Sequence, residues 1–443
     1  MRRLTFLVLA SALIGLAPAH PLVAAGRTFY VSPSGSNANP GTAAKPFRTI
    51  QWGVNAARPG DSVLVGEGTY TATSFPLVEL RRGGARGSPL TVAAAPGATP
   101  VLRGTPEYRY GIILDPGVSY VTIAGLEFEN FSGDAIQLAC DACSSDVEHR
   151  NVRVRGVEVS GGGTAFRPTN GARIWVLDSW FHDNDEVGID CAPGPCNQLT
   201  VARTRLERHT GYDWSDGLAV ERGRGILVVD SLARQNAGDG FDSKASDTRV
   251  LRSRSLDNAR DGIKLWEGDS EIRDSISAGN GLTSVVLESG GTFVLANSLV
   301  ADGGAAERSY GMTVAYDGGP ATTFRMFNTI FAANNGTALY LGGQVTLARE
   351  DHDLFATGGD ENSAIVYKGK DYSEADLNDG TWRRSSGLGR GTFAASPAFQ
   401  GAGDYHLRAG SPGVDDGTAS GASAIFRQTN AAHHASATSL ARR

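Results

Sequence analysis

A short repeat runs from about residue 120 to residue 345 and limits the folds that this chain can adopt. Each unit has a hydrophobic alternation, then Ser or Thr, then usually Asn five positions later, and then a Gly turn. The pairs with this five-residue offset are Ser179/Asn184, Thr204/His209, Ser231/Asn236, Ser253/Asn258, Ser275/Asn280 and Thr329/Asn334, with Ser298/Gly303 at the remaining step. The Ser or Thr positions advance by a nearly constant step of roughly 22 residues, which insertions lengthen in some units.

Stretches such as RIWVLDSWF and GILVVDSL alternate apolar and polar residues, which predicts strands. A unit this short cannot bury its own apolar face, but identical coils stacked about 4.8 Å apart would bury it. A β-propeller would need blades of about 40 residues, which are longer than these units. Leucine-rich repeats would need a Leu-rich consensus, which the units lack. The sequence therefore predicts an all-β solenoid, a parallel β-helix with N-terminal and C-terminal caps, in which stacked Asn side chains bond neighbouring coils.

The composition agrees with a turn-rich fold. Of 443 residues 57 are Gly, while only 20% are charged and 3 are Met, which disfavours long helices and coiled coils. The formal charge of -6 comes from 41 Lys and Arg against 47 Asp and Glu, so no overall basic field attracts nucleic acid. An acidic ligand would therefore need a local site or a bridging cation.

The N-terminus carries two arginines before an apolar run that ends in small residues, which is typical of a secretory signal peptide cleaved after Ala19 or Ala25. A membrane anchor is the alternative, but this run is shorter than the roughly 20 residues that a spanning helix needs. The predicted segments are a signal peptide at 1–25, a β-helix domain with its caps at 26–416 and a disordered tail at 417–443. A short helix is expected at 50–57, and a turn-rich closing segment at 395–418 spans the boundary between domain and tail. We expect a secreted monomer, extracellular or periplasmic, without a membrane or nucleic-acid partner.

Four cysteines form two close pairs, Cys140 with Cys143 and Cys191 with Cys196. In an oxidising compartment they indicate two disulfides, for which three connectivities are possible. Zinc binding is the rival interpretation, but no His flanks either pair at the spacing of a zinc finger. We therefore favour structural bridges that pin two surface turns.

Aligning the units on the turn Gly gathers polar residues on one outer face. The first column holds Asp190, Ala219, Asp242, Lys264 and Val286; the second, two positions on, holds Glu221, Lys244 and Trp266; the third, just before the Gly, holds Asp216, Asp239 and Asp261. Neighbours within a column would lie about one strand spacing apart. Carboxylates and amines from three or four coils would therefore meet in one patch.

Several Asp oxygens on one face suit a hard cation such as calcium, and Asp216, Asp239 and Asp242 are the best candidates. Lys264 falls beside Asp242, and bound calcium would lower the pKa of this lysine from about 10.4 and make a neutral amine available as a base. Two alternatives stay open. Asp-Gly is a common turn dipeptide, and the charges of the first two columns could form cross-strand ion pairs worth about 0.2–1 kcal/mol each.

Three further residues lie in this region. We expect His182 and His209 to be turn residues rather than ligands or bases. Trp214 lies beside the insertion TGYDWSDG, where it either lines a sugar groove or covers apolar surface.

These segments resemble the right-handed parallel β-helix polysaccharide lyases, most closely the family-nine pectate lyases. The opening FYVSPSGSNANPGTAAKPFRTIQWGVNAARPGDSVLVGEGTY resembles the N-terminal cap of that family, and the resemblance extends to the closing GDYHLRAGSPGVDDGT. SDGLA and AGDGFD are similar to the calcium-ligand segments, which implies Asp216, Asp239 and Asp242 as ligands, and DGIKL is similar to the segment with the catalytic lysine, which implies Lys264. Gly238 stands where the family has an acidic ligand, and Asp190 or Asp213 is our candidate for the missing oxygen.

The resemblance implies a secreted, calcium-dependent lyase that cleaves an acidic polyuronate, pectate or a related polymer, by β-elimination. Lys264 would be the base, and Arg260 and Lys244 would hold neighbouring substrate carboxylates. The alternative is a non-catalytic secreted β-helix that binds surface glycan or acts as an adhesin. The loss of one acidic ligand at Gly238 supports this alternative. A hydrolase is a third and less favoured alternative, since it would need paired carboxylates at hydrolytic spacing and no lysine base. An alginate epimerase on the same fold would share with the lyase the first step, proton abstraction at carbon 5.

Overall fold

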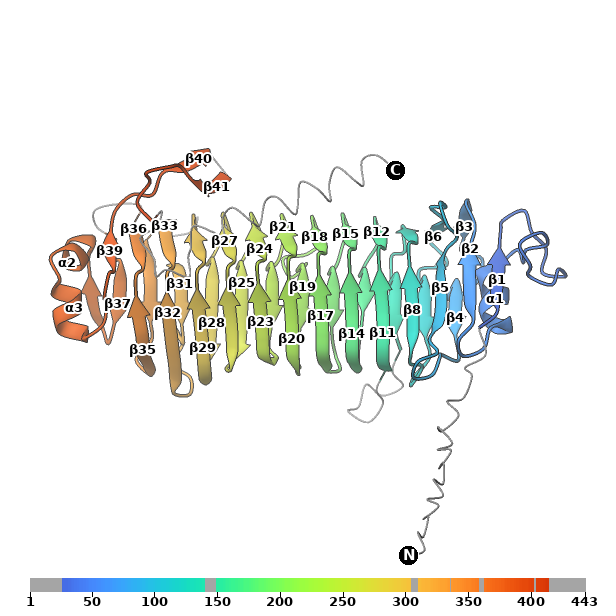
Figure 1. The fold of residues 1–443 in the computed structure, drawn as a ribbon, viewed down its shortest axis with the longest axis horizontal. Helices are drawn as coiled ribbons and strands as arrows, with labels where there is room; N and C mark the ends of the chain where they lie inside the picture. Colours follow the sequence, from blue (N-terminus) through green and yellow to red (C-terminus); the bar gives the residue numbers. More distant parts are fainter. Residues whose placement is uncertain are drawn as a thin grey trace, which may run out of the picture.

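The computed structural model describes residues 26–139, 149–303, 310–334, 336–357, 362–401 and 404–413. Within these ranges the chain winds into an elongated solenoid, with three sheets running along its length (Figure 1). The predicted signal peptide, the predicted tail and the Cys140/Cys143 pair lie outside the described residues.

Each of the three long sheets has thirteen strands within the described residues. Sheet 1 consists of β1 (Thr28–Val31), β2 (Ser62–Val65), β5 (Leu90–Ala94), β8 (Val121–Ala124), β11 (His149–Arg155), β14 (Gly171–Leu177), β17 (Cys196–Ala202), β20 (Gly223–Val229), β23 (Ser246–Leu251), β26 (Ser270–Arg273), β29 (Gly291–Ala296), β32 (Thr322–Phe327) and β35 (Val345–Asp351). Sheet 2 consists of β4 (Val78–Leu80), β7 (Ile112–Leu114), β10 (Ile136–Leu138), β13 (Phe166–Arg167), β16 (Ile189–Cys191), β19 (Leu218–Val220), β22 (Phe241–Ser243), β25 (Ile263–Glu267), β28 (Val285–Ser289), β31 (Tyr310–Val314), β34 (Thr337–Leu341), β37 (Ile365–Tyr367) and β38 (Lys370–Tyr372). Sheet 3 consists of β3 (Thr69–Thr71), β6 (Val101–Arg103), β9 (Glu127–Glu129), β12 (Glu158–Ser160), β15 (Trp180–His182), β18 (Arg205–Glu207), β21 (Leu232–Arg234), β24 (Arg254–Leu256), β27 (Ile276–Ala278), β30 (Leu299–Ala301), β33 (Ile330–Asn334), β36 (Leu354–Thr357) and β39 (Phe393–Ala394).

Each strand pairs in parallel with the equivalent strand of the next coil, as β19 does with β22 and β22 with β25. The closing strand of sheet 2 differs, because β38 pairs antiparallel with β37. The predicted right-handed parallel β-helix is therefore confirmed.

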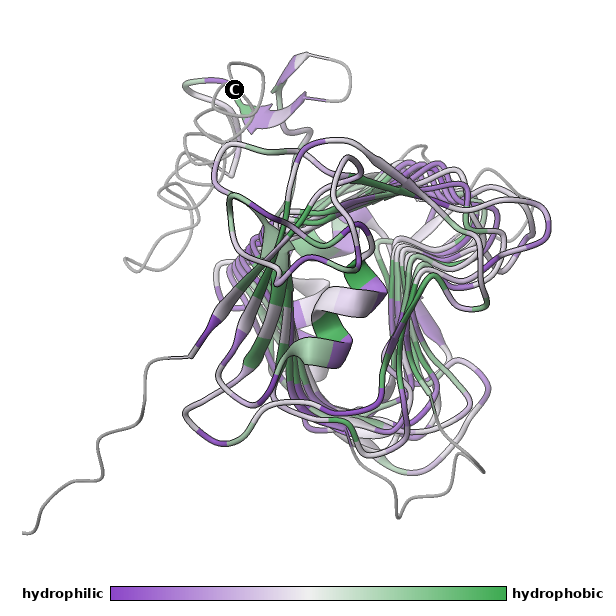
Figure 2. Ribbon diagram, turned by 90° about the vertical axis from the view of Figure 1, so that its right-hand side faces the viewer, coloured by the Kyte–Doolittle hydropathy of each residue, from purple (hydrophilic) through white to green (hydrophobic). Residues whose placement is uncertain are grey.

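The core lies inside the coils, where inward side chains stack from one coil to the next. One ladder in sheet 1 consists of Val176, Val201, Val228, Val250 and Ile272, all at most 1% exposed. Figure 2 looks along the solenoid and shows its strands stacked around a common interior, with hydrophobic and hydrophilic residues both present along them. The alternation that predicted strands thus has one side inward and the other toward solvent.

The predicted Asn column is confirmed as a buried hydrogen-bond ladder. The backbone N–H of Asn236 donates to Asn258 Oδ1 at 3.2 Å, and that of Asn258 donates to Asn280 Oδ1 at 3.1 Å. The Asn236 side-chain amide also donates to Asn258 Oδ1 at 2.9 Å. Each side chain therefore satisfies polar groups at the same turn of the adjacent coil.

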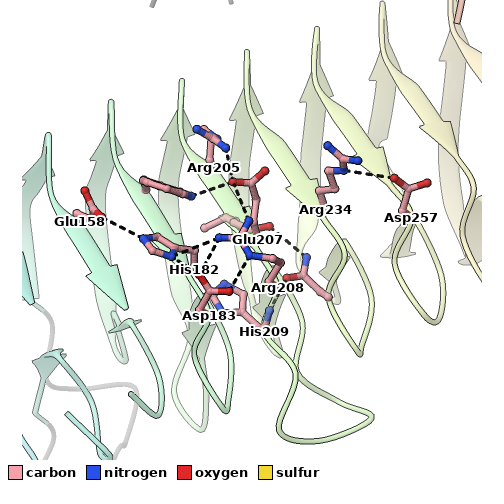
Figure 3. A network of polar contacts seen from close by, with 12 residues as sticks. Glu158, His182, Asp183, Arg205, Glu207, Arg208, His209, Arg234 and Asp257 are labelled. Atoms are coloured by element: carbon pink, nitrogen blue, oxygen red, sulfur yellow. Dashed lines mark hydrogen bonds and ion pairs between the residues drawn. The ribbon is translucent and has the colours of Figure 1, made fainter. Parts of the chain in front are cut away.

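His209 interrupts this ladder. Its backbone N–H donates to Asn236 Oδ1 at 3.1 Å, but its imidazole is fully buried and neither ring nitrogen has a hydrogen-bond partner in the described part of the structure. Burial, together with the charge on the neighbouring His182 (Figure 3), lowers the pKa of His209 to about 3. The residue is therefore neutral in the folded protein.

We expect His209→Asn to raise the free energy of unfolding at pH 7 by about 1 kcal/mol, because Asn would extend the ladder where two buried ring nitrogens are unsatisfied. The unfolded chain takes up a proton at His209 below about pH 6.5, whereas the folded chain does so only near pH 3. Wild-type stability should therefore fall as pH decreases through this window, by up to about 1.4 kcal/mol per pH unit, and the variant should lose this contribution. Urea unfolding at several pH values measures both effects.

His149→Asn is the matched control for this prediction. His149 is also fully buried, but its Nδ1 is hydrogen-bonded to the Val118 carbonyl oxygen at 2.8 Å and its Nε2 to that of Ala139 at 2.7 Å. Replacing it should destabilise the fold by about 1–3 kcal/mol. A His209→Asn protein that is equally destabilised would contradict the ladder interpretation.

The N-terminal coil is covered by helix α1 (Ile50–Ala56), close to the predicted position. At the other end lie two short helices, α2 (Glu374–Asn378) and α3 (Thr381–Ser386), and Trp382 of α3 is 1% exposed. None of the helices in the described ranges is long and apolar enough to cross a membrane.

The predicted closing segment takes a different place from the one expected of a cap. It forms a hairpin of β40 (Phe399–Gly401) and β41 (Asp404–Leu407) beside the coils rather than over their end (Figure 1). The reason is an apolar outer stripe on sheet 3, where Leu299, Ile330 and Leu354 pack against Phe399 and Leu407.

Candidate functional site

The polar columns lie on the outer face of sheet 2. The register of β16, β19, β22, β25 and β28 aligns, in order, Asp190, Ala219, Asp242, Lys264 and Val286. The predicted first column is therefore confirmed, residue by residue. Side chains that are far apart in the sequence become neighbours because the coils repeat at a nearly constant step.

The aspartates that precede the turn Gly bond successive coils. Asp216 Oδ1 accepts the backbone N–H of Asp239 at 2.6 Å, Asp239 Oδ1 accepts that of Asp261 at 2.8 Å, and Asp261 Oδ1 accepts that of Thr283 at 2.9 Å. The turn role that the sequence left open is thus present. It uses one carboxylate oxygen of each residue and leaves the second for other contacts.

Three of these carboxylates converge. Asp216, Asp239 and Asp242 each offer one oxygen, and these oxygens lie within 4.8 Å of one another. All three residues are at most 8% exposed. Burial, together with the neighbouring Asp239 charge, raises the pKa of Asp216 to about 8 and that of Asp242 to about 7.

The donor set fits a hard divalent cation. Calcium prefers carboxylate oxygens, and here several buried carboxylates lie together, with Lys264 and Arg260 as close counter-charges. A divalent cation among them would relieve the mutual repulsion that raises the pKa values of Asp216 and Asp242.

Lys264 reaches into this cluster from the next coil. Its Nζ lies 3.5 Å from Asp239 Oδ2 and 3.5 Å from Asp261 Oδ2, and its side chain is 15% exposed. Burial lowers the pKa of Lys264, but the attraction of Asp239, Asp242 and Asp261 outweighs it, so the net pKa is raised. The predicted lowering therefore depends on a cation that neutralises these aspartates.

Trp266 belongs to the cluster, although the sequence alone assigned it no role. Its Nε1–H donates to Asp242 Oδ1 at 2.8 Å, and Lys264 Nζ lies 5.1 Å from its ring centroid. The signal in the sequence is its place two positions after Lys264, on the same outer face as Asp242. Trp266 thus orients a carboxylate and lies beside the lysine amine.

The two predicted substrate-holding residues lie beside the cluster. Lys244 Nζ donates to both carboxylate oxygens of Glu221, at 2.6 and 2.7 Å, which is the cross-strand ion pair that the columns left open as an alternative. Arg260 is held by a longer contact than Lys244, because its Nε lies 3.7 Å from Asp239 Oδ1, and its side chain is 42% exposed. Their part in holding substrate stays a prediction.

The candidate for the missing calcium ligand on the preceding coil has another partner. Asp190 pairs with Arg167, and the Arg167 Nε also donates to Asp134 Oδ2 at 3.0 Å. Neither Asp190 nor Asp213 belongs to the carboxylate group that converges in the described residues.

His182 and His209 lie away from this site. His182 is the last residue of β15, and its ring stacks on Trp180 with the ring centroids 3.8 Å apart. Its two ring nitrogens pair with Glu158 and Asp183 (Figure 3). Neither histidine is a ligand or base of the cluster, as the sequence predicted.

One predicted disulfide is present. Cys191 at the end of β16 is bonded to Cys196 at the start of β17, so this bridge closes the CAPGPC turn next to sheet 2. Of the three connectivities left open, the Cys191–Cys196 bond fits the one that joins the two cysteines of each close pair. Cys140 and Cys143 lie outside the described residues.

Gly238 is where an acidic side chain would be expected from the resemblance, and the structure leaves no space for one. A Cβ at this position would lie 2.1 Å from Asp216 Oδ1 and 2.9 Å from the backbone carbonyl carbons of Ser215 and Trp214. The Asp216 carboxylate and the turn before it therefore occupy the space beside Gly238.

We expect Gly238→Ala to lower the free energy of unfolding by about 1–3 kcal/mol, because the new methyl group must displace the turn or the Asp216 carboxylate. Gly343→Ala is the control, since a Cβ there would have no atom within 4 Å. Neither glycine has the left-handed backbone conformation that would strain an alanine. Equal urea midpoints for the two variants would show that the close approach at Gly238 is unimportant.

The chain is similar to several known proteins. A family model described as "Pel9A-like, right handed beta helix region" matches residues 29–340. The uncharacterized protein YwoF of Bacillus subtilis is 30% identical over 144 residues, 30% of each chain, and pectate lyase L of Dickeya chrysanthemi is 24% identical over 270 residues, 58% of this chain and 54% of the relative. The chain thus spans about half or less of the length of these curated relatives.

A similar solved structure is the crystal structure of pectate lyase Pel9A, with 17% identity and a TM-score of 0.48 over 88% of this chain and 92% of that chain. The family match begins in β1 and ends in β34, so it includes the coils that carry the carboxylate cluster and Lys264. Because it covers well over half of the chain, this protein belongs to the Pel9A-like right-handed β-helix family.

Proposed function

We propose that this protein is a secreted, calcium-dependent polysaccharide lyase that cleaves an acidic polyuronate, pectate or a related polymer, by β-elimination. The observation that carries the proposal is the convergence of Asp216, Asp239 and Asp242 on one outer face, with the Lys264 amine 3.5 Å from Asp239. The similarity to pectate lyase L supports the substrate class.

Asp216, Asp239 and Asp242 would hold the calcium ion. When bound, calcium supplies positive charge that stabilises the negative charge developing on the substrate carboxylate. The chain carries a net charge of -6 and its proposed substrate is also an anion. A bound cation would therefore reduce the electrostatic repulsion between protein and substrate.

Lys264 acts as the general base in this proposal. Its neutral amine takes the proton from carbon 5 of the uronate, and the electron pair of that C–H bond forms the double bond between carbons 4 and 5. The bond from carbon 4 to oxygen 4 then breaks, and the leaving oxygen takes a proton from solvent. Asp239 and Asp261 position the amine, and Trp266 fixes the orientation of Asp242.

A substrate screen tests the proposal. Polygalacturonate, alginate and glycosaminoglycans are incubated with the protein and calcium, and the ultraviolet absorbance of the conjugated product is followed. We expect unsaturated ends from a polygalacturonate-type polymer. Lack of unsaturated product from all three polymer classes would overturn the lyase assignment.

The second candidate is a non-catalytic glycan-binding β-helix, and Gly238 favours it because one acidic side chain of the family pattern is missing. Such a protein would bind the same polymers and form no unsaturated product. The screen therefore separates the two functions when retention of the protein on each polymer is measured alongside absorbance.

A further inference from the structure

One coil of the solenoid is longer than its neighbours beside the carboxylate cluster. The Asn column and the turn Asp column are three residues apart from Asn236 to Asp239 and from Asn258 to Asp261. They are seven residues apart from His209 to Asp216, so this coil carries four additional residues at this point. The insertion enters between β18 and β19, just before the first calcium-ligand candidate.

This insertion presents two aromatic side chains to solvent. Tyr212 and Trp214 stack with ring centroids 4.6 Å apart and an interplanar angle of 7°. They are 50% and 51% exposed, which makes them two of the six large hydrophobic residues exposed in the described ranges. The exposed parts of these two rings offer flat, apolar surface to a further partner.

The turn that carries the pair is held in place by its own hydrogen bonds. Ser215 Oγ donates to the Asp185 carbonyl oxygen at 2.8 Å and accepts the Tyr212 N–H at 3.0 Å. The Gly238 N–H donates to the Ser215 carbonyl oxygen at 3.1 Å. The pair is therefore preorganised, and a ligand that binds it does not have to order the turn first.

Gly238 packs against both this turn and Asp216 of the carboxylate cluster. The backbone of Trp214 approaches so closely that a Cβ at Gly238 would lie 2.9 Å from the Trp214 carbonyl carbon. Gly238 immediately precedes Asp239, and Trp214 lies two residues before Asp216. The position that lacks an acidic side chain is thus the one against which the backbone of the aromatic turn and the Asp216 carboxylate both pack.

We propose that the Tyr212–Trp214 pair is a positioning element that stacks on the apolar C–H face of a pyranose ring in the uronate chain, next to the residue held at the carboxylate cluster. This inference rests on the proposed function and adds a subsite to it. An aromatic contact of this kind contributes binding without charge.

Kinetics on polygalacturonate with calcium test the subsite. Trp214→Ala should raise KM about tenfold and leave kcat within about twofold, because stacking on a ring that does not react stabilises ground state and transition state alike. Trp214→Phe, which keeps a flat ring, should restore most of the affinity. Trp52→Ala removes a similarly exposed tryptophan (49%) from α1 and should leave KM unchanged. An unchanged KM in Trp214→Ala would overturn the inference.

Binding without turnover separates this inference from the lyase assignment. The same variants are compared by electrophoresis in gels that contain polygalacturonate or alginate, with calcium. Retardation of the wild type that is lost in Trp214→Ala and kept in Trp52→Ala supports the subsite even if no polymer is cleaved. Equal mobility of the wild type and Trp214→Ala in every gel contradicts the subsite, whether or not the protein is a lyase.

Discussion

Lys264→Ala should reduce the rate of β-elimination by about 10²–10⁴-fold, the usual contribution of a general base. The lysine amine lies 3.5 Å from both Asp239 and Asp261 and faces the outer side of sheet 2, where a bound chain would pass. Removing it takes away the group proposed to accept the proton from carbon 5. The rate is measured as unsaturated product formed from polygalacturonate under saturating calcium.

Two control variants separate the loss of the base from the loss of charge. Lys264→Arg keeps a positive charge among the aspartates, but a guanidinium does not deprotonate in proteins, so this variant should be as inactive as Lys264→Ala. Lys45→Ala removes an exposed lysine near the N-terminal end and should keep the full rate. Thermal unfolding of each variant confirms that the fold is retained. A Lys264→Ala protein with the wild-type rate would exclude Lys264 as the base.

Asp239→Asn should weaken calcium binding by at least about 100-fold and abolish calcium-dependent activity. Asp239 is central to the site, because its Oδ1 bonds the Asp261 N–H and its carboxylate shares the cluster with Asp216 and Asp242. Asn keeps an oxygen for the backbone bond but loses the negative charge that a hard cation requires. Titration calorimetry with calcium, free of substrate, measures the affinity directly.

Calcium should also stabilise the folded wild type. If the ion binds only the folded chain, a concentration 100 times the Kd adds about 2.7 kcal/mol to the free energy of unfolding, and Asp239→Asn should lose this gain. Asp257→Asn is the matched control, since Asp257 is an exposed carboxylate just after β24 that pairs with Arg234. If calcium stabilised Asp239→Asn as much as the wild type, the ion would be bound elsewhere.

The repeat made most of the fold predictable. A nearly constant step between units fixes which side chains stack, so the alignment of Asp242 with Lys264 followed from counting. The Asn ladder was predictable for the same reason, since one residue type recurs at one turn. In a solenoid, each coil contacts chiefly its neighbours, and this turns a sequence interval into a spatial distance.

The features that could not be predicted depend on packing between irregular segments. The crowding at Gly238 arises because the inserted turn folds against the next coil, and no local pattern specifies that contact. The unsatisfied His209 ring became visible only once the ladder geometry was known. The bond from Trp266 to Asp242 joins adjacent coils through a side-chain orientation that the column alignment does not fix.

We propose that a calcium-assisted elimination occurs at the Asp216–Asp239–Asp242 cluster. The most direct measurement is the formation of unsaturated uronide from polygalacturonate by the purified protein, first with calcium, then with excess chelator, and then with calcium restored. We expect product with calcium, none with chelator, and recovery when calcium is returned. Product formed at an undiminished rate in chelator, or no unsaturated product even with calcium, would contradict the claim.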